Sequence, residues 1–313
     1  MRIARAAVLV LSGLAACSTP RPATEGVITV PGGRIYWARM GNGPGTPLIV
    51  IHGGPGSTSY GLKPWAALGD ERPVIRYDQL GSGKSDHPSD TALFTVERSV
   101  QELQALRDSL GLGEVHLYGR SWGAMLVEAY MGTGPAGVRS VVLSSPLITT
   151  QQWERDADSL LKTLPDSVQG VIARHEAAGT TNSPEYGAAA AEYYKLYVIR
   201  QPRRSPADVD SALKSHGDLE YQYMWGPSEF TATGTLKHFD ATEWIRNLKV
   251  PTLFVTGEFD EATPSSTEMF SKMVPGAEFK VIPNSGHATE NDNPDALLKV
   301  VREFLRRVEG KRN

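Results

Sequence analysis

The chain has 313 residues, of which 40% are hydrophobic and 21% are charged, and its formal net charge is -3. These values are close to those of globular domains, so they exclude a mostly disordered or collagen-like chain. The charge offers no basic field for nucleic acid. A single cysteine excludes both an intramolecular disulfide framework and a thiolate zinc cluster.

The first 17 residues have the pattern of an export signal. Arg2 and Arg5 precede an apolar run from Ala6 to Ala16, which is shorter than the roughly 20 residues that a membrane-spanning helix needs. The residues Leu14-Ala15-Ala16-Cys17 resemble the lipobox of bacterial lipoproteins. The resemblance implies that Cys17 carries lipid and becomes the mature N-terminus.

A lipid on Cys17 would tether the protein to the bacterial envelope, because several acyl chains on one residue give stable attachment. Ser18 after the cysteine is similar to outer-membrane sorting in Gram-negative lipoproteins. The alternative is an ordinary signal peptide, which would leave a soluble periplasmic or secreted protein. Residues 18–25, with two prolines, are expected to form a short linker.

The remaining chain has the pattern of a doubly wound α/β core. Residues 27–30 and 34–38 flank a Pro-Gly-Gly turn and predict a hairpin. Six short apolar runs then suit a parallel sheet buried on both faces, and helical patterns at 96–110 and 122–131 separate some of them. The six runs are 47–51, 74–77, 115–118, 141–143, 252–255 and 279–282.

The pattern of strands is interrupted between residues 147 and 243. This region is rich in helical pattern, including residues 188–200, and contains no convincing buried strand. Because the strand pattern resumes afterwards, we expect an inserted helical cap at 147–243. It would divide one core domain into residues 26–146 and 244–313.

The sequence Gly119-Arg120-Ser121-Trp122-Gly123 follows one predicted strand and opens a helix. This is the nucleophile-elbow pattern, in which a sharp turn exposes a serine hydroxyl at the carboxyl end of a sheet. His52-Gly53-Gly54-Pro55-Gly56 follows another strand and is expected to form an oxyanion hole. The backbone N–H groups of Gly54 and Trp122 would be its donors.

An acid and a histidine follow later strands, in the chain order that this type of site requires. Asp260 and Glu261 lie at the end of one strand, and His287 follows the next. His287 would take the proton of Ser121 while Asp260 orients the imidazole. Spacing to Pro264 favours Asp260 over Glu261, although two neighbouring acids could exchange roles. The other six histidines are expected to be packed or solvent-facing.

Three motifs together resemble the proline iminopeptidase family of α/β-hydrolases. They are the glycine-rich loop at 52–56, the stretch Asp78-Gln79-Leu80-Gly81-Ser82-Gly83-Lys84-Ser85 and the Gly-x-Ser-Trp-Gly elbow. Residues 224–237 are similar to the tricorn-interacting-factor and L-amino-acid-amidase branch. The resemblance covers residues 26–305 and implies the α/β-hydrolase fold and a serine aminopeptidase. Its substrates would be short peptides or amino-acid amides, and it would need no metal or organic cofactor.

The resemblance also implies that two glutamates hold the free amine of the substrate. The matching residues are Glu229, in the motif Gly-Pro-x-Glu-Phe, and Glu261. A buried ammonium needs carboxylate partners to offset its desolvation. The alternative is that both are solvated or helix-capping carboxylates. Candidates for the side-chain pocket are Tyr221, Tyr223, Trp225 and Phe230.

One residue departs from the family pattern. Family members commonly have glycine before the nucleophile, where this chain has Arg120. A long cation there could pair with a nearby acid or alter the pocket, so it bears on substrate preference and leaves the reaction class unchanged.

Two other functions remain open at this point. One is an esterase or amidase of the same fold without free-amine specificity, and the other is a ligand-binding lipoprotein without catalysis. The presence of Ser121, Asp260 and His287 argues against the second.

Overall fold

The computed structural model describes residues 24–202 and 206–310. The predicted leader with Cys17, and residues 18–23 of the predicted linker, lie outside the described residues. In the described part of the chain, no helix combines the length and apolar character needed to cross a membrane.

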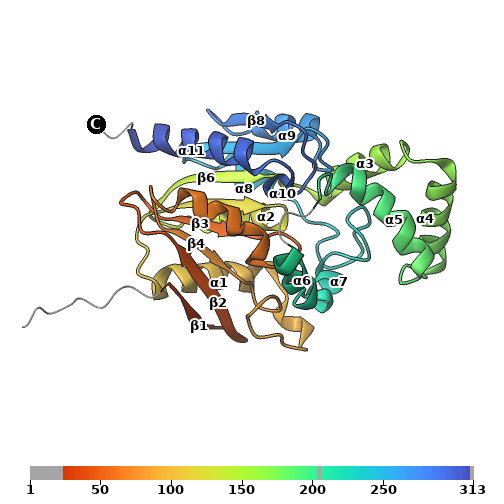
Figure 1. Cartoon of the computed structure of the whole chain (residues 1–313), viewed down its shortest axis with the longest axis horizontal. Coiled ribbons are helices and arrows are strands. Elements are labelled where there is room, and N and C mark those ends of the chain that lie inside the picture. The colour runs from red at the N-terminus through yellow and green to blue at the C-terminus, as the bar shows by residue number, and fades with distance from the viewer. Residues whose placement is uncertain (1–23, 203–205, 311–313) are drawn as a thin grey trace, which may run out of the picture.

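An eight-stranded sheet forms the centre of the molecule, in the order β1-β2-β4-β3-β5-β6-β7-β8 (Figure 1). The first two strands form the predicted antiparallel hairpin, and β2 pairs antiparallel with β4. All pairings from β4 to β8 are parallel. The strands are β1 (Glu25–Val30), β2 (Gly33–Met40), β3 (Leu48–Ile51), β4 (Val74–Tyr77), β5 (Val115–Arg120), β6 (Val138–Ser144), β7 (Thr252–Gly257) and β8 (Glu278–Ile282). The mostly parallel, doubly wound sheet is therefore confirmed.

Helices cover both faces of this sheet. One face packs against α1 (Val96–Ser109), α2 (Trp122–Gly132), α8 (Thr242–Arg246) and α9 (Pro264–Ser271). The other packs against the 3-10 helix η1 (Ser59–Leu68) and α11 (Pro294–Gly310). Two short elements, η2 (Thr91–Leu93) and α10 (Thr289–Asp292), lie in loops. The strands β3, β4 and β7 are buried along their whole length, as expected for a sheet covered on both sides.

Five of the helices described between β6 and β7 lie at one end of the sheet (Figure 1). They are α3 (Thr150–Leu161), α4 (Asp166–Ala178), α5 (Pro184–Tyr197), α6 (Pro206–Lys214) and α7 (Asp218–Met224). The first three of these helices, together with Phe230, form a small apolar cluster of their own around Tyr186 and Tyr193. An isolated antiparallel bridge between Thr149 and Asp240 joins the two chain segments that lead into and out of this region. We call residues 149–240 the cap.

The cap contacts the core through closely approaching backbones. The N–H of Gly217 donates to the carbonyl of Gly56 at 2.7 Å, and the N–H of Gly83 donates to the carbonyl of Ser215 at 2.8 Å. A Cβ on Gly56 would lie 2.4 Å from the Gly217 carbonyl oxygen, so a side chain would separate the two segments. The loop that precedes α7 is thus held against the predicted oxyanion loop.

A buried acid lies just beyond this contact. Glu220 in α7 is 1% exposed, and neither of its carboxyl oxygens has a hydrogen-bond partner among residues 24–202 and 206–310. Burial, reinforced by the nearby Glu102 carboxylate, raises the pKa of Glu220 to about 8. Arg98 offsets this effect only in part, because it is already paired with Glu102 at 2.5 Å. At neutral pH the cap therefore packs on the core with Glu220 protonated.

Protonation of Glu220 makes stability depend on pH. Between the usual carboxyl pKa of 4.5 and about 8, the folded state holds a proton that the unfolded state has lost. The free energy of unfolding should therefore fall as pH rises through this window, by up to about 1.4 kcal/mol per pH unit. Glu220→Gln keeps the neutral shape, so it should reduce this slope and be more stable than the wild type at pH 8.

Urea unfolding at pH 5 and pH 8 measures the effect. Glu192→Gln, on the exposed side of α5, is the matched control and should retain the wild-type slope. An unchanged slope in Glu220→Gln would contradict the protonation described above.

Candidate active site

Ser121 lies in the tight turn between β5 and α2. Its backbone has φ 56° and ψ -125°, a conformation that a non-glycine residue adopts only under constraint from its surroundings. A Cβ on Gly119 would lie 2.2 Å from the Gly123 carbonyl oxygen, and one on Gly123 would lie 2.5 Å from that of Ile51. Both glycines of the predicted elbow are thus required by close backbone packing. The serine is placed at the carboxyl end of β5.

Asp260 and His287 follow β7 and β8 at the same edge of the sheet. The Nδ1 atom of His287 lies 2.8 Å from Oδ1 of Asp260. Burial alone would raise the pKa of Asp260, but the charge and hydrogen bond of His287, together with other donors, outweigh burial and lower it. Asp260 is therefore the acid that contacts the histidine most closely, as predicted from its spacing. No hydrogen bond joins Ser121 to His287 in the described structure.

Four further donors hold Asp260 in place. The hydroxyls of Ser145 and Thr256 and the N–H of Gly257 donate to Oδ2 at 2.5, 3.1 and 3.0 Å. The N–H of Ala262 donates to Oδ1 at 2.9 Å. Ser145, which follows β6, was not found from the sequence, because a lone serine after a strand has no distinguishing pattern.

The loop that carries His287 is bound to the end of the cap helix α5. The N–H groups of His287 and Ala288 each donate at 2.8 Å, to the carbonyls of Tyr197 and Val198 respectively. The indole of Trp153 from α3 meets the imidazole edge-on, with ring centres 5.5 Å apart. The cap therefore supports the histidine directly.

The predicted oxyanion loop is held by a buried network. Gly54 has φ 112°, and neither its N–H nor that of Trp122 is used by another group in the parts of the chain that the structure describes. The backbone N–H of Gln79 donates to Nε2 of His52 at 3.0 Å, and the Trp122 indole donates to the Gln79 side chain at 2.8 Å. Gln79 thus joins this loop to the elbow.

His52 and Gln79 both have structural roles, of which the sequence predicted only that of His52. Burial lowers the pKa of His52 to about 4, so it is neutral and packed, as expected. The role of Gln79 was missed, although Gln79 belongs to the stretch 78–85 that carries the family resemblance.

Two more carboxyl groups lie near His287. Glu261 is 1% exposed, with Oε1 at 3.9 Å from Nδ1 of His287, and neither oxygen has a hydrogen-bond partner among the described residues. Burial, followed by the charges of Glu229 and Asp260, raises the pKa of Glu261 well above its usual value. Burial also raises the pKa of Glu229, against the charge of His287 and the nearby Tyr221 hydroxyl. The predicted pair from cap and core is therefore brought together.

Some of the aromatic side chains of this region lie beside Glu229 and Glu261, and others pack elsewhere. The Tyr193 hydroxyl is buried, faces Glu261 and lacks a hydrogen-bond partner in the described chain. Of the predicted pocket residues, Tyr221 lies beside Glu229, Trp225 packs on Trp153, and Phe230 packs in the cap cluster. Tyr223 is 37% exposed and packs on Phe94.

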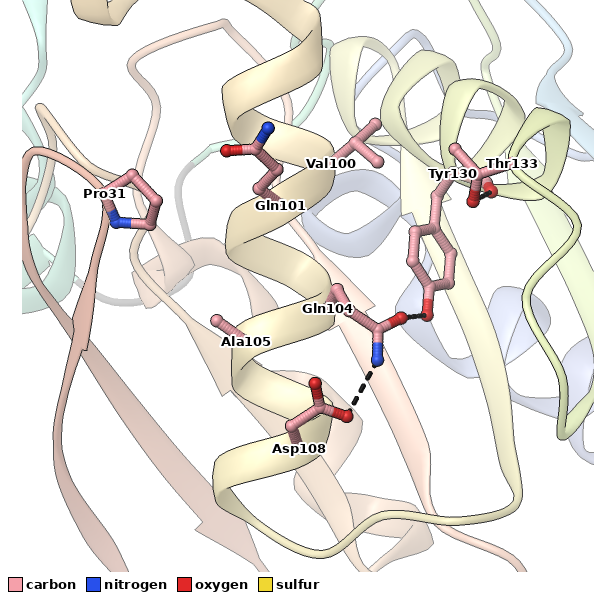
Figure 2. A pocket seen from close by; sticks show the side chains of 8 residues that line it. All are labelled: Pro31, Val100, Gln101, Gln104, Ala105, Asp108, Tyr130 and Thr133. Carbon is pink, nitrogen blue, oxygen red and sulfur yellow. Dashed lines mark hydrogen bonds between the residues drawn. The ribbon is translucent and has the colours of Figure 1, made fainter.

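A hollow of about 400 Å³ lies elsewhere, on the outer side of α1 (Figure 2). The Gln104 side chain crosses it, accepting from the Tyr130 hydroxyl at 2.6 Å and donating to Asp108 at 2.8 Å. It borders the C-terminal end of α2, whereas Ser121 precedes the N-terminus of that helix, so it is separate from the candidate active site. Within residues 24–202 and 206–310 no group of three or more His, Cys, Asp or Glu side chains could hold a metal ion.

Comparison with known proteins agrees with this geometry. Residues 46–293 match the family described as the alpha/beta hydrolase fold. A proline iminopeptidase of Heyndrickxia coagulans is 44% identical over 287 residues, which cover 91% of this chain and 99% of that protein. One from Saccharolobus solfataricus is 33% identical, covering 83% and 85%. The chain belongs to the proline iminopeptidase family of aminopeptidases.

Solved structures place it in the same group. A proline iminopeptidase of Mycobacterium smegmatis is 31% identical with a TM-score of 0.84, over 92% of this chain and all of that one. The crystal structure of VinJ has the same identity and coverage with a TM-score of 0.87. A thermophilic esterase from Thermogutta terrifontis, 23% identical with a TM-score of 0.65, shares the fold alone.

The contact of Ser145 with Asp260 predicts an effect on activity. Ser145→Ala removes the 2.5 Å donor, which should raise the pKa of Asp260 and loosen its hold on His287. Loss of one hydrogen bond to a charged group should lower kcat/KM about tenfold. This decrease should become larger toward acidic pH. Steady-state rates on an aminoacyl-nitroanilide across pH 5–9 would measure it.

Ser140→Ala is the control for this experiment. Ser140 lies on β6, the strand that Ser145 follows; it is equally buried and bonds His116 at 2.7 Å, far from the proposed triad. Equal activities of the two variants at every pH would show that Ser145 does not support the acid.

Proposed function

We propose that this protein is a serine aminopeptidase that releases one N-terminal residue from short peptides or amino-acid amides. The released residue would be proline or another small or hydrophobic residue. The family membership supports the reaction class, and the names of the relatives support proline. The proposed catalytic residues are Ser121, Asp260 and His287.

In this mechanism Ser121 Oγ attacks the scissile carbonyl and its proton passes to Nε2 of His287. The N–H groups of Gly54 and Trp122 would stabilise the tetrahedral oxyanion. The carbon–nitrogen bond then breaks, and His287 returns the proton to the leaving amine. Water, deprotonated by His287, hydrolyses the acyl-enzyme and restores the serine hydroxyl. The absence of a Ser121–His287 hydrogen bond is compatible with these roles, because such bonds often tighten only with substrate bound.

The observation that carries the proposal is the pair formed by half-buried Glu229 and fully buried Glu261, of which Glu261 has no hydrogen-bond partner among the described residues. A buried carboxyl group without partners is unfavourable unless something compensates for it. An ammonium group between the two glutamates would supply the missing charge and hydrogen bonds, and would leave the adjacent carbonyl near Ser121. An esterase without free-amine specificity has no use for this pair.

Blocking the amine tests the proposal. Proline, alanine, leucine and phenylalanine nitroanilides should be cleaved with a free amine, and at least about 100-fold more slowly when N-acetylated, since the acetyl group removes the charge that the glutamates bind. Glu229→Gln should reduce the ratio of free to blocked rates, and Glu192→Gln should leave it unchanged. Ser121→Ala, expected to fold normally and to abolish turnover, gives the background. Equal cleavage of free and acetylated substrates would favour the esterase alternative.

We also propose that the mature protein is anchored to the bacterial envelope through lipid on Cys17, on the periplasmic side of the outer membrane. The resemblance of residues 14–17 to a lipobox supports this. The segment lies outside the described residues, and an ordinary signal peptide would leave a soluble exported protein instead.

Fractionation of a Gram-negative host that expresses the full chain would test the anchor. The wild type should sediment with the outer membrane and be released by detergent, because two or more acyl chains hold a protein stably. Cys17→Ser should lose that attachment. A wild-type protein found wholly in the soluble periplasmic fraction, with no acyl group by mass spectrometry, would contradict the proposal.

A further inference from the structure

Arg120 places a positive charge beside the nucleophile. A Cβ built on Gly53 would lie 3.0 Å from Cβ of Ser121 and 3.6 Å from a guanidinium nitrogen of Arg120. The guanidinium and the serine therefore border the same residue of the oxyanion loop. Arg120 keeps 22% of its side chain exposed.

The guanidinium has unused donors. Its nearest acid is Glu290, at 3.7 Å, which is an ion pair too long for a hydrogen bond. The other oxygen of Glu290 accepts from the Tyr118 hydroxyl at 2.5 Å. In the described residues no donor of Arg120 makes a hydrogen bond, and its Nε is buried without a partner. Arg107, by contrast, donates three.

The position of Glu290 indicates which side of the substrate Arg120 faces. Glu290 follows His287 by three residues, so Arg120 is held toward the loop that carries the histidine. The leaving nitrogen must also lie there, since it receives its proton from His287. The amine end of the substrate would lie at Glu229 and Glu261. The charge of Arg120 also acts on both glutamates, lowering their pKa against the effect of burial. The cation and the two acids therefore share one site, in which the acids would bind the amine of the substrate.

We propose that Arg120 binds the C-terminal carboxylate of the leaving residue and makes the enzyme prefer dipeptides that have a free carboxylate. The assignment rests on the proposed aminopeptidase function. A planar guanidinium with free N–H donors binds a carboxylate through two parallel hydrogen bonds. In a dipeptide that carboxylate is only one residue beyond the scissile bond, whereas an amide or a longer peptide has no charge at this position.

Matched dipeptides test the assignment. Pro-Ala and Pro-Ala-amide share the scissile bond and the free amine and differ only in the terminal charge. The wild type should cleave Pro-Ala with a kcat/KM about tenfold or more above that of the amide, the difference that one charged hydrogen-bonded contact gives. In R120Q the ratio should fall to about one, through the KM of Pro-Ala more than through kcat.

Two further variants complete the experiment. R120K keeps the charge but loses the planar fork, so its ratio should lie between those of the wild type and R120Q, and it tests the proposal if R120Q does not fold. R139Q removes an arginine paired with Glu114 on the surface and should keep the wild-type ratio. A wild-type ratio near one, or a ratio unchanged in R120Q and R120K, would overturn the role of Arg120. Failure to cleave either dipeptide or any free-amine nitroanilide would instead overturn the aminopeptidase function and this inference with it.

Discussion

Asp260 and Glu261 are neighbours and equally buried, but only Asp260 receives hydrogen bonds in the described chain. The proposed chemistry of the site depends on that difference. Asp260 receives hydrogen bonds from two hydroxyls, two backbone N–H groups and His287, so it stays ionised. Glu261 receives none in the described chain, and burial, followed by the charges of Glu229 and Asp260, raises its pKa well above the usual value. Environments that push two acids apart in pKa assign them different tasks. In the proposed mechanism Asp260 orients the histidine, and Glu261 is left to bind the amine of the substrate.

The sheet makes this arrangement possible because its parallel strands all end at one edge. In the described residues, the three non-glycine residues with positive φ are Ser121, Ser145 and Asn284. They follow β5, β6 and β8, and each lies in a loop that carries or contacts a member of the proposed triad. Backbone strain of this kind persists only where the surrounding packing enforces it. The rigid sheet therefore bears the strain that holds the site in shape.

Local sequence patterns predict the strands and the residues that follow them. Buried strands are continuous apolar runs, and the nucleophile, acid and histidine follow such runs in a fixed order. Contacts between distant segments have no such signal. Ser145 reaches Asp260 across 115 positions. The raised pKa of Glu220 depends first on burial between cap and core and then on the Glu102 carboxylate of another helix. The helix predicted at 188–200 lies at Pro184–Tyr197 because the Ser183 side chain caps its start and the histidine loop binds its end.

The two backbone hydrogen bonds from the histidine loop to the end of α5 tie the position of His287 to that of the cap. If the cap swung away from the core, Tyr197 and Val198 would move with it, and His287 would lose the segment that fixes its backbone. The position of His287 therefore depends on the cap as well as on the loop that follows β8.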